Sequence, residues 1–211
     1  MTIQKVEGKE AIVYFDGDRC IHSRNCVLNR PDVFVPNVKG EWIFPDRATI
    51  AEIAEIAHNC PSGAISYQRV DGKTAETAPL VNTIRIRENG PLALHAPITV
   101  DGESKGFRLT LCRCGHSHNK PYCDGQHAVQ HFVATSEPPV KASEPLKQRD
   151  GTLAVEPLKN GPLQVKGNQE IVSGTGKTIN RTTDTHLCRC GHSNNKPYCD
   201  GTHAKVGFKS K

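Results

Sequence analysis

LCRCGHSHNKPYCDGQH (residues 111–127) and LCRCGHSNNKPYCDGTH (residues 187–203) are two copies of one stretch that organises this chain. Each copy spaces three cysteines and one histidine as C-x-C-x8-C-x3-H. Three thiolates and one imidazole on a short loop supply the donors that a transition metal or a small iron–sulfur cluster requires. The sequence therefore predicts two metal sites. Their ligands are Cys112, Cys114, Cys123 and His127 in the first copy, and Cys188, Cys190, Cys199 and His203 in the second.

The spacing of the donors also predicts how each loop closes. Cys112 and Cys114 lie two apart on an extended segment, so both sulfurs project to one side. Asp124 occupies the position expected of a helix N-cap, which would place Cys123 and His127 one turn apart on one helix face. An extended pair and a helical pair together make a site with four donors, and the second loop repeats the pattern.

The composition is lean for one large core. The chain has 211 residues, of which 36% are hydrophobic and 5% aromatic, so small modules stapled by metal are favoured. Nine cysteines, an odd number, argue against a closed disulfide framework. No apolar run is long enough for a signal peptide or a membrane span, which predicts a soluble cytoplasmic protein. The net charge is only +5 and the Lys and Arg residues are scattered rather than clustered, so nucleic-acid binding is not expected.

Residues 1–70 form a different module, with three further cysteines as candidate ligands. Residues 46–59 carry the best helical pattern, with Thr49 and Glu52 placed as a capping box. Four short apolar runs predict strands, at residues 11–15, 33–35, 42–44 and 64–68. The candidate ligands are Cys20, Cys26 and Cys60.

The repeat extends beyond the metal loops. Asn-Gly-Pro turns at residues 89–91 and 160–162 precede strand-like stretches at 92–100 and 163–172, and another short strand leads into each loop. Polar, proline-containing linkers occupy residues 71–79 and 135–150. The expected domains are therefore residues 1–70, 79–134 and 151–211.

The two loops resemble the CDGSH iron–sulfur (NEET) family. Its pattern C-x-C-x2-S-x3-P-x-C-D-G-x-H is matched in both copies, including Ser117 and Pro121, while the serine of the family name is Gln126 here and Thr202 in the second copy. The resemblance implies a 2Fe–2S cluster held by three cysteines and one histidine in each loop. Two-motif members resemble an internal pseudo-dimer, which implies a monomer.

The N-terminal module resembles the divergent ferredoxin-like mono-cluster domain found beside or fused to CDGSH proteins. The resemblance rests on YFDGDRCIH and CPSGAISY, with C-x5-C followed by a distal Cys-Pro. Ordinary ferredoxins begin with C-x2-C-x2-C, and Ser23 occupies the middle position here. Three cysteines suit a 3Fe–4S cluster, whereas a 4Fe–4S cluster would take His22 or Ser23 as its fourth ligand. Buried free cysteines are the structural alternative.

The expected fold is α+β, a ferredoxin-like domain followed by a β-rich tandem CDGSH pseudo-dimer with short helices at the cluster loops. The expected function is electron transfer through three clusters to a redox partner protein, without enzymatic activity. A carrier or sensor that donates 2Fe–2S clusters to apo-proteins is the first alternative. A zinc-stapled interaction protein is the second, because three cysteines and one histidine also suit zinc.

Overall fold

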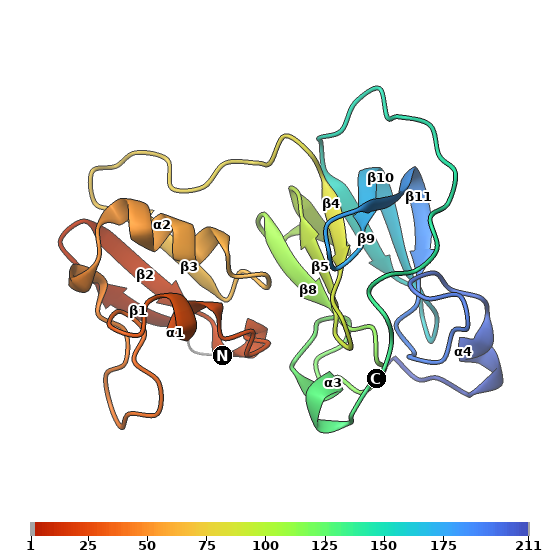
Figure 1. Ribbon diagram of the computed structural model, residues 1–211, viewed down its shortest axis with the longest axis horizontal. Coiled ribbons are helices and arrows are strands. Elements are labelled where there is room, and N and C mark those ends of the chain that lie inside the picture. The colour runs from red at the N-terminus through yellow and green to blue at the C-terminus, as the bar shows by residue number, and fades with distance from the viewer. Residues whose placement is uncertain (1–2, 211) are drawn as a thin grey trace. The chain divides into compact units, whose positions relative to one another are not determined.

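The computed structural model describes residues 3–210 and divides the chain into two compact units, Met1–Thr77 and Ala78–Lys211. The first unit combines one sheet with helices, and the second is rich in strands (Figure 1). The predicted α+β class is confirmed. Both predicted CDGSH domains lie in the second unit. No helix in residues 3–210 is long and apolar enough to cross a membrane.

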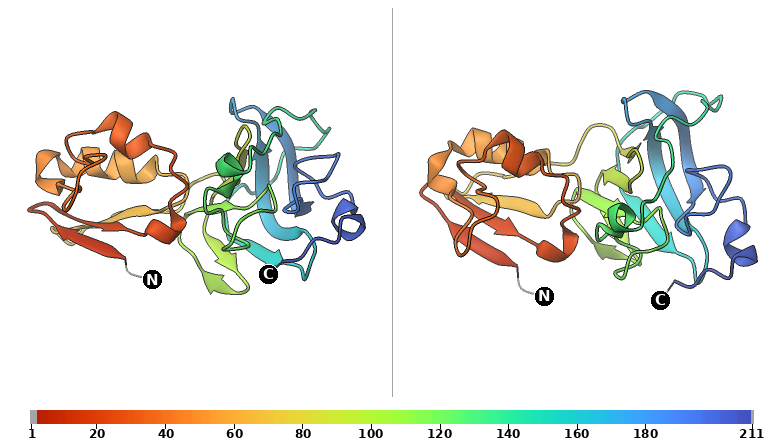
Figure 2. Two further views of the ribbon diagram at one scale, coloured as in Figure 1. Left: turned by 90° about the horizontal axis from the view of Figure 1, so that it is seen from below. Right: turned by 60° about the horizontal axis from the view of Figure 1, so that its bottom comes forward.

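The first unit packs its main helix on a three-stranded antiparallel sheet. The strand order is β1-β2-β3, and α2 lies over one face of the sheet (Figure 2). Val13 and Ile65 point from the sheet into the core that Ile53 of α2 completes. The elements are β1 (Gln4–Glu7), β2 (Ala11–Phe15), the 3-10 turn Gly17–Arg19, α1 (Asn25–Asn29), the 3-10 turn Pro45–Arg47, α2 (Ile50–His58) and β3 (Ile65–Arg69).

The predicted capping box is confirmed at the start of α2. The Thr49 Oγ1 accepts the N–H of Glu52 at 3.4 Å, and the Glu52 carboxylate accepts the N–H of Thr49 at 2.8 Å. The helix begins later than predicted, because the residues before Thr49 form the separate 3-10 turn.

The two strands predicted at residues 33–35 and 42–44 are wrong. Only an isolated bridge joins Phe34 and Ile43. Pro36 follows the first segment and Pro45 follows the second, and neither proline has an N–H to extend the ladder.

In the second unit the two copies of the repeat exchange strands. The first copy contributes β4 (Thr83–Ile86), β5 (Leu92–His95), β6 (Ile98–Val100), β7 (Glu103–Ser104) and β8 (Arg108–Leu111). The second contributes β9 (Leu153–Pro157), β10 (Leu163–Val172) and β11 (Thr178–Leu187). β4 pairs in parallel with the end of β10 (Figure 1). β9 pairs in parallel with β6. Neither copy therefore completes its sheet alone.

The two copies differ in the middle of this exchange. The strand predicted at residues 92–100 is split into β5 and β6 at Ala96 and Pro97, where proline has no N–H to donate. In the second copy β10 runs on through a bulge at Gly167, whose φ is +118°. A Cβ at Gly167 would overlap the carbonyl oxygen of Thr152, so the close approach of the two chain segments requires glycine.

The linker at residues 135–150 lies along β11. The backbone N–H of Lys141 donates to the carbonyl oxygen of Ile179 at 2.8 Å, and the N–H of Arg181 donates to the Ser143 hydroxyl at 3.1 Å. These bonds occupy donors and acceptors at the edge of the strand, which would otherwise be open to pairing with another chain. The linker is therefore part of the folded unit.

The bulge at Gly167 yields a prediction about stability. Gly167→Ala is expected to cost roughly 2–4 kcal/mol of unfolding free energy, because a side chain meets both the positive φ and the Thr152 carbonyl. Gly102→Ala is the matched control, since Gly102 also has positive φ (+83°) but has open space where a Cβ would stand. Thermal denaturation followed by circular dichroism measures both variants. Equal losses of unfolding free energy in the two variants would show that the close approach of Gly167 to Thr152 does not contribute to stability.

Candidate iron–sulfur sites

Each metal loop is held at the end of a strand by the chain folding back on itself. In the first loop the Cys112 N–H donates to the carbonyl of Pro121 at 2.8 Å, and the Cys123 N–H donates to that of Thr110 at 3.0 Å. The second loop repeats both bonds, from Cys188 to Pro197 at 2.8 Å and from Cys199 to His186 at 2.9 Å. The loop geometry is therefore built twice from the same local sequence.

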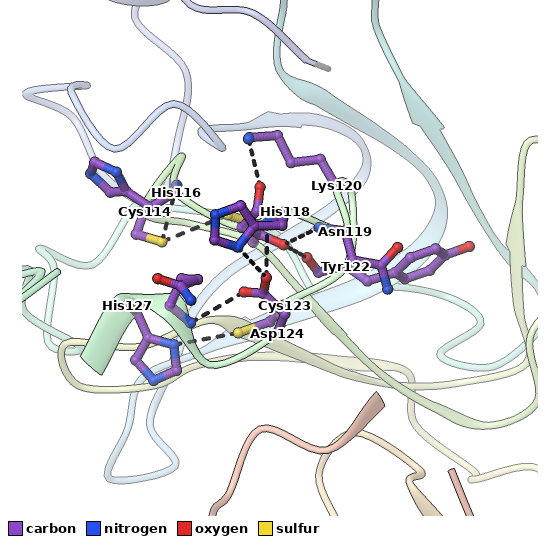
Figure 3. A network of polar contacts seen from close by, with 12 residues as sticks. Cys114, His116, His118, Asn119, Lys120, Tyr122, Cys123, Asp124 and His127 are labelled. Carbon is purple, nitrogen blue, oxygen red and sulfur yellow. Dashed lines mark hydrogen bonds and ion pairs between the residues drawn. The ribbon is translucent and has the colours of Figure 1, made fainter. Parts of the chain in front are cut away.

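The donors of the first loop lie in two pairs. The sulfurs of Cys112 and Cys114 are 3.7 Å apart, and the Cys123 sulfur lies 3.4 Å from the His127 Nδ1 (Figure 3). Two ligands on one tetrahedral metal with bonds of 2.0–2.3 Å lie about 3.3–3.8 Å apart. Each pair therefore has the size that suits one metal ion. No group of three or more Cys, His, Asp or Glu side chains gathers at one ion position within residues 3–210.

Pairs of donors fit a binuclear cluster better than a single ion. A structural zinc site requires four ligands around one centre, whereas a 2Fe–2S cluster has two irons that each take two protein ligands. The two donor pairs of the first loop therefore match the two irons of a 2Fe–2S cluster.

The second loop differs at its histidine. Cys188 and Cys190 form the same pair, with sulfurs 3.6 Å apart. The His203 Nδ1 lies 3.0 Å from the carbonyl oxygen of Asn160, so this nitrogen faces the backbone. If Nδ1 carries the proton of this contact, Nε2 keeps the lone pair that a metal needs. The Nδ1 of His127 therefore faces a cysteine sulfur, whereas the Nδ1 of His203 faces a backbone carbonyl.

Burial raises the pKa of two ligand thiols, that of Cys123 to about 12 and that of Cys190 to about 11. The hydrogen bond between Cys112 and Cys114 lowers the pKa of Cys112 and raises that of Cys114. A bound cation must displace the remaining protons, so metal binding to these loops releases protons.

Side chains between the ligands fix the loop (Figure 3). The Ser117 hydroxyl donates to the carbonyl of Tyr122 at 2.7 Å, and Lys120 donates to the carbonyl of Ser117 at 2.6 Å. The Asp124 carboxylate accepts the backbone N–H groups of His118 at 2.8 Å and Gln126 at 3.2 Å. These bonds tie the two halves of the loop together.

The predicted helical pair of Cys123 and His127 is wrong in one respect. The helix α3 (Gln126–Val129) has only four residues and its N-cap is Gly125, with φ of +89°, so Cys123 precedes the helix. The turn at Gly125 still brings the two ligands together. The second copy is built alike, with Gly201 as the N-cap of α4 (Thr202–Lys205). The predicted short helices at the cluster loops are present.

Two buried arginines support the loops, and the sequence pattern alone did not identify them. Arg113 stands between the first two cysteines, is 1% exposed, and donates to the carbonyls of Gly90, Arg87, Ala134 and Thr135. Arg189 repeats the role by donating to the carbonyls of Gly161 and Leu158. The recurrence of arginine at the same place in both C-x-C pairs is the signal that could have found them.

The two loops also contact each other. Gly115 has φ of +85°, and a Cβ there would lie 2.5 Å from the carbonyl oxygen of Cys190. Gly191 stands in the same relation to the carbonyl of Cys114. Burial lowers the pKa of both arginines; negative charge at Glu88, Cys188 and Cys114 opposes this at Arg113, and charge at Cys112 and Asp101 opposes it at Arg189. The sites are therefore coupled in packing and in charge.

The three N-terminal cysteines line one cavity of about 510 Å³. Cys60 is buried, whereas Cys20 and Cys26 are partly exposed at its wall. Burial raises the pKa of Cys20 and of Cys26. The structure thus brings the distant Cys60 to the same cavity as Cys20 and Cys26, around a space large enough for a cluster.

The buried arginine yields a test of loop support. Arg113→Lys keeps the charge but cannot reach four carbonyls with a single ammonium, and unpaired buried carbonyls are costly. We expect a loss of roughly 2–4 kcal/mol in unfolding free energy and faster bleaching of the visible bands. Arg85→Lys is the control, because Arg85 is exposed and makes one contact at 3.4 Å. Equal behaviour of the two variants would contradict the role of Arg113.

Comparison with known proteins covers all three modules of the chain. The family model described as "Iron-binding zinc finger CDGSH type" matches residues 89–128 and 160–204. The model described as "Divergent 4Fe-4S mono-cluster" matches residues 6–70. The first model therefore matches each copy of the repeat, and the second matches the N-terminal module. No solved structure matches the chain.

Curated relatives extend the comparison. CDGSH iron-sulfur domain-containing protein 1 of Rattus norvegicus is 30% identical over 100 residues, which cover 47% of this chain and 82% of the relative. Its counterpart in Bos taurus is 31% identical over 91 residues, 43% of this chain and 76% of the relative. The uncharacterized protein YjdI of Escherichia coli (strain K12) is 39% identical over 62 residues, 29% of this chain and 79% of the relative. The chain belongs to the CDGSH iron–sulfur family and joins two CDGSH motifs to an N-terminal divergent 4Fe–4S mono-cluster domain.

Proposed function

We propose that the chain is an electron-transfer protein. In this proposal each CDGSH loop holds one 2Fe–2S cluster, and the N-terminal cavity holds one 3Fe–4S or 4Fe–4S cluster. The observation that carries the proposal is the pairing of donors, Cys112 with Cys114 and Cys123 with His127. Two pairs match the two irons of a binuclear cluster. When bound, such clusters supply centres that accept and release single electrons.

The burial of the ligands supports a redox role. Cys112, Cys114 and Cys123 are 1%, 4% and 3% exposed, so the thiol side of the site is closed to water. His127 is only partly buried and marks the edge that a partner protein can approach. A buried site with one ligand near the surface permits electron exchange while its thiolates stay protected.

Charge around the loops supports reduction of a bound cluster. Cys-ligated clusters are anionic, and Arg113 and Arg189 place buried positive charge beside the thiols. A neutral imidazole in place of a thiolate makes each site less negative. Both effects favour addition of an electron, so we expect a potential above the value of about −400 mV of plant-type ferredoxins.

A carrier that donates 2Fe–2S clusters to apo-proteins is the second candidate, and one observation favours it. In the second loop both Cys199 and His203 are partly exposed, whereas Cys123 of the first loop is buried. An acceptor thiolate could reach this pair of ligands. If the chain transfers clusters, the second loop should release its cluster first.

We further propose the setting in which this function operates. The partner is a redox protein, or an apo-protein acceptor in the second candidate function. The chain acts as a monomer, since the exchange of β4 and β9 between copies supplies the contacts that a dimer would otherwise provide. A reducing cytoplasm fits ligands that must persist as free thiolates.

Reduction and reoxidation of the full chain without oxygen separate the two functions. Electron transfer predicts that the visible bands bleach with dithionite and return over repeated cycles, with no loss of iron. Cluster donation predicts instead that incubation with an apo-ferredoxin moves 2Fe–2S to the acceptor within minutes. Transfer in the oxidised state, together with poor recovery after cycling, would contradict the electron-transfer proposal.

A further inference from the structure

The N-terminal cavity offers more donors than its three cysteines. His22, Ser23 and Ser62 line it together with Cys20, Cys26 and Cys60. We propose that His22 is the fourth protein ligand of this cavity and that the cluster held there is therefore a 4Fe–4S cluster. This inference rests on the proposed function, because it assumes that the cavity holds a cluster.

The geometry of His22 favours it as a ligand. Its backbone N–H donates to the Cys20 sulfur at 3.4 Å, and its Nδ1 lies 4.0 Å from the same sulfur. The imidazole therefore sits beside the first thiol at the wall of the cavity. Because the residue is exposed, the ring is free to rotate toward a cluster without disturbing the core.

The backbone around His22 is unusual. His22 has φ of +53° and Arg24 has φ of +64°, so two non-glycine residues adopt left-handed conformations within three positions. Such conformations are unfavourable for residues with a Cβ and concentrate at binding sites. Here they turn the segment between Cys20 and Cys26 so that the His22 backbone and ring both face the Cys20 sulfur.

The two serines are weaker ligands for chemical reasons. A serine hydroxyl is a hard donor that must lose its proton to replace a thiolate, whereas imidazole binds iron as a neutral group, as in Rieske clusters. Ser62 is also committed: it is 2% exposed, its hydroxyl accepts the N–H of Ala64 at 3.3 Å, and the same oxygen already lies 3.7 Å from the Cys60 sulfur in a hydrogen bond. Ser23 also lines the cavity and lies in the same turn as His22, but its hydroxyl is the harder donor of the two.

Electron paramagnetic resonance of the oxidised full chain tests the proposal without interference from the other clusters. Oxidised 2Fe–2S clusters and the usual oxidised 4Fe–4S state have an even number of electrons and no signal. A 3Fe–4S cluster with three ferric irons has an odd number and must show one. The protein is reconstituted without oxygen and oxidised only until the 2Fe–2S bands are complete.

The expected result is that the wild-type protein is silent and His22→Ala shows a three-iron signal of about one spin per chain, because the iron without a protein ligand is lost. Ser23→Ala, at the adjacent position in the same turn, should remain silent. His22→Cys should also be silent, since a thiolate restores the fourth ligand. Circular dichroism checks that the variants are folded.

Several results would overturn the proposal. A three-iron signal in the wild-type protein means that no fourth ligand exists, and a signal only in Ser23→Ala assigns the role to serine. Silence of His22→Ala with all its iron retained means that His22 is not needed. A count of about four irons and four sulfides per chain would leave the cavity without a cluster, which contradicts the N-terminal part of the proposed function as well.

Discussion

The contact between the two metal loops is the constraint on which the second unit depends. Gly115 lies against the carbonyl of Cys190 and Gly191 against that of Cys114, so each loop needs a glycine where it meets the backbone of the other. The strand exchange of β4 and β9 brings the loops to this meeting point. Two motifs in one chain therefore act as one folded body.

Charge also acts between the loops. Burial lowers the pKa of Arg113 and Arg189, and negative charge at Cys188 and Cys114 opposes this at Arg113, as charge at Cys112 does at Arg189. Burying a guanidinium is costly unless its donors are satisfied and an opposite charge is near. The backbone carbonyls supply the first condition, and anionic clusters would supply the second. The arginines thus connect the stability of the unit to the sites that it holds.

Local patterns in the sequence predicted local geometry. The structure pairs the sulfurs of Cys112 and Cys114, and it places the Cys123 sulfur beside His127. The predicted capping box at Thr49 is present, because both features depend on neighbouring residues. The parallel pairing of β4 with β10 joins distant segments and leaves no signature in spacing. Arg113 was missed because a charged residue in a loop is ordinarily taken as solvent-exposed.

The central claim is that each CDGSH loop binds two irons through two unlike donor pairs. Mössbauer spectroscopy of the oxidised full chain, enriched in a Mössbauer-active iron isotope, tests it most directly. We predict ferric doublets of equal area from two inequivalent irons in each loop, one with two thiolates and one with a thiolate and an imidazole. Bound zinc without sulfide, or a single symmetric ferric doublet, would contradict the account.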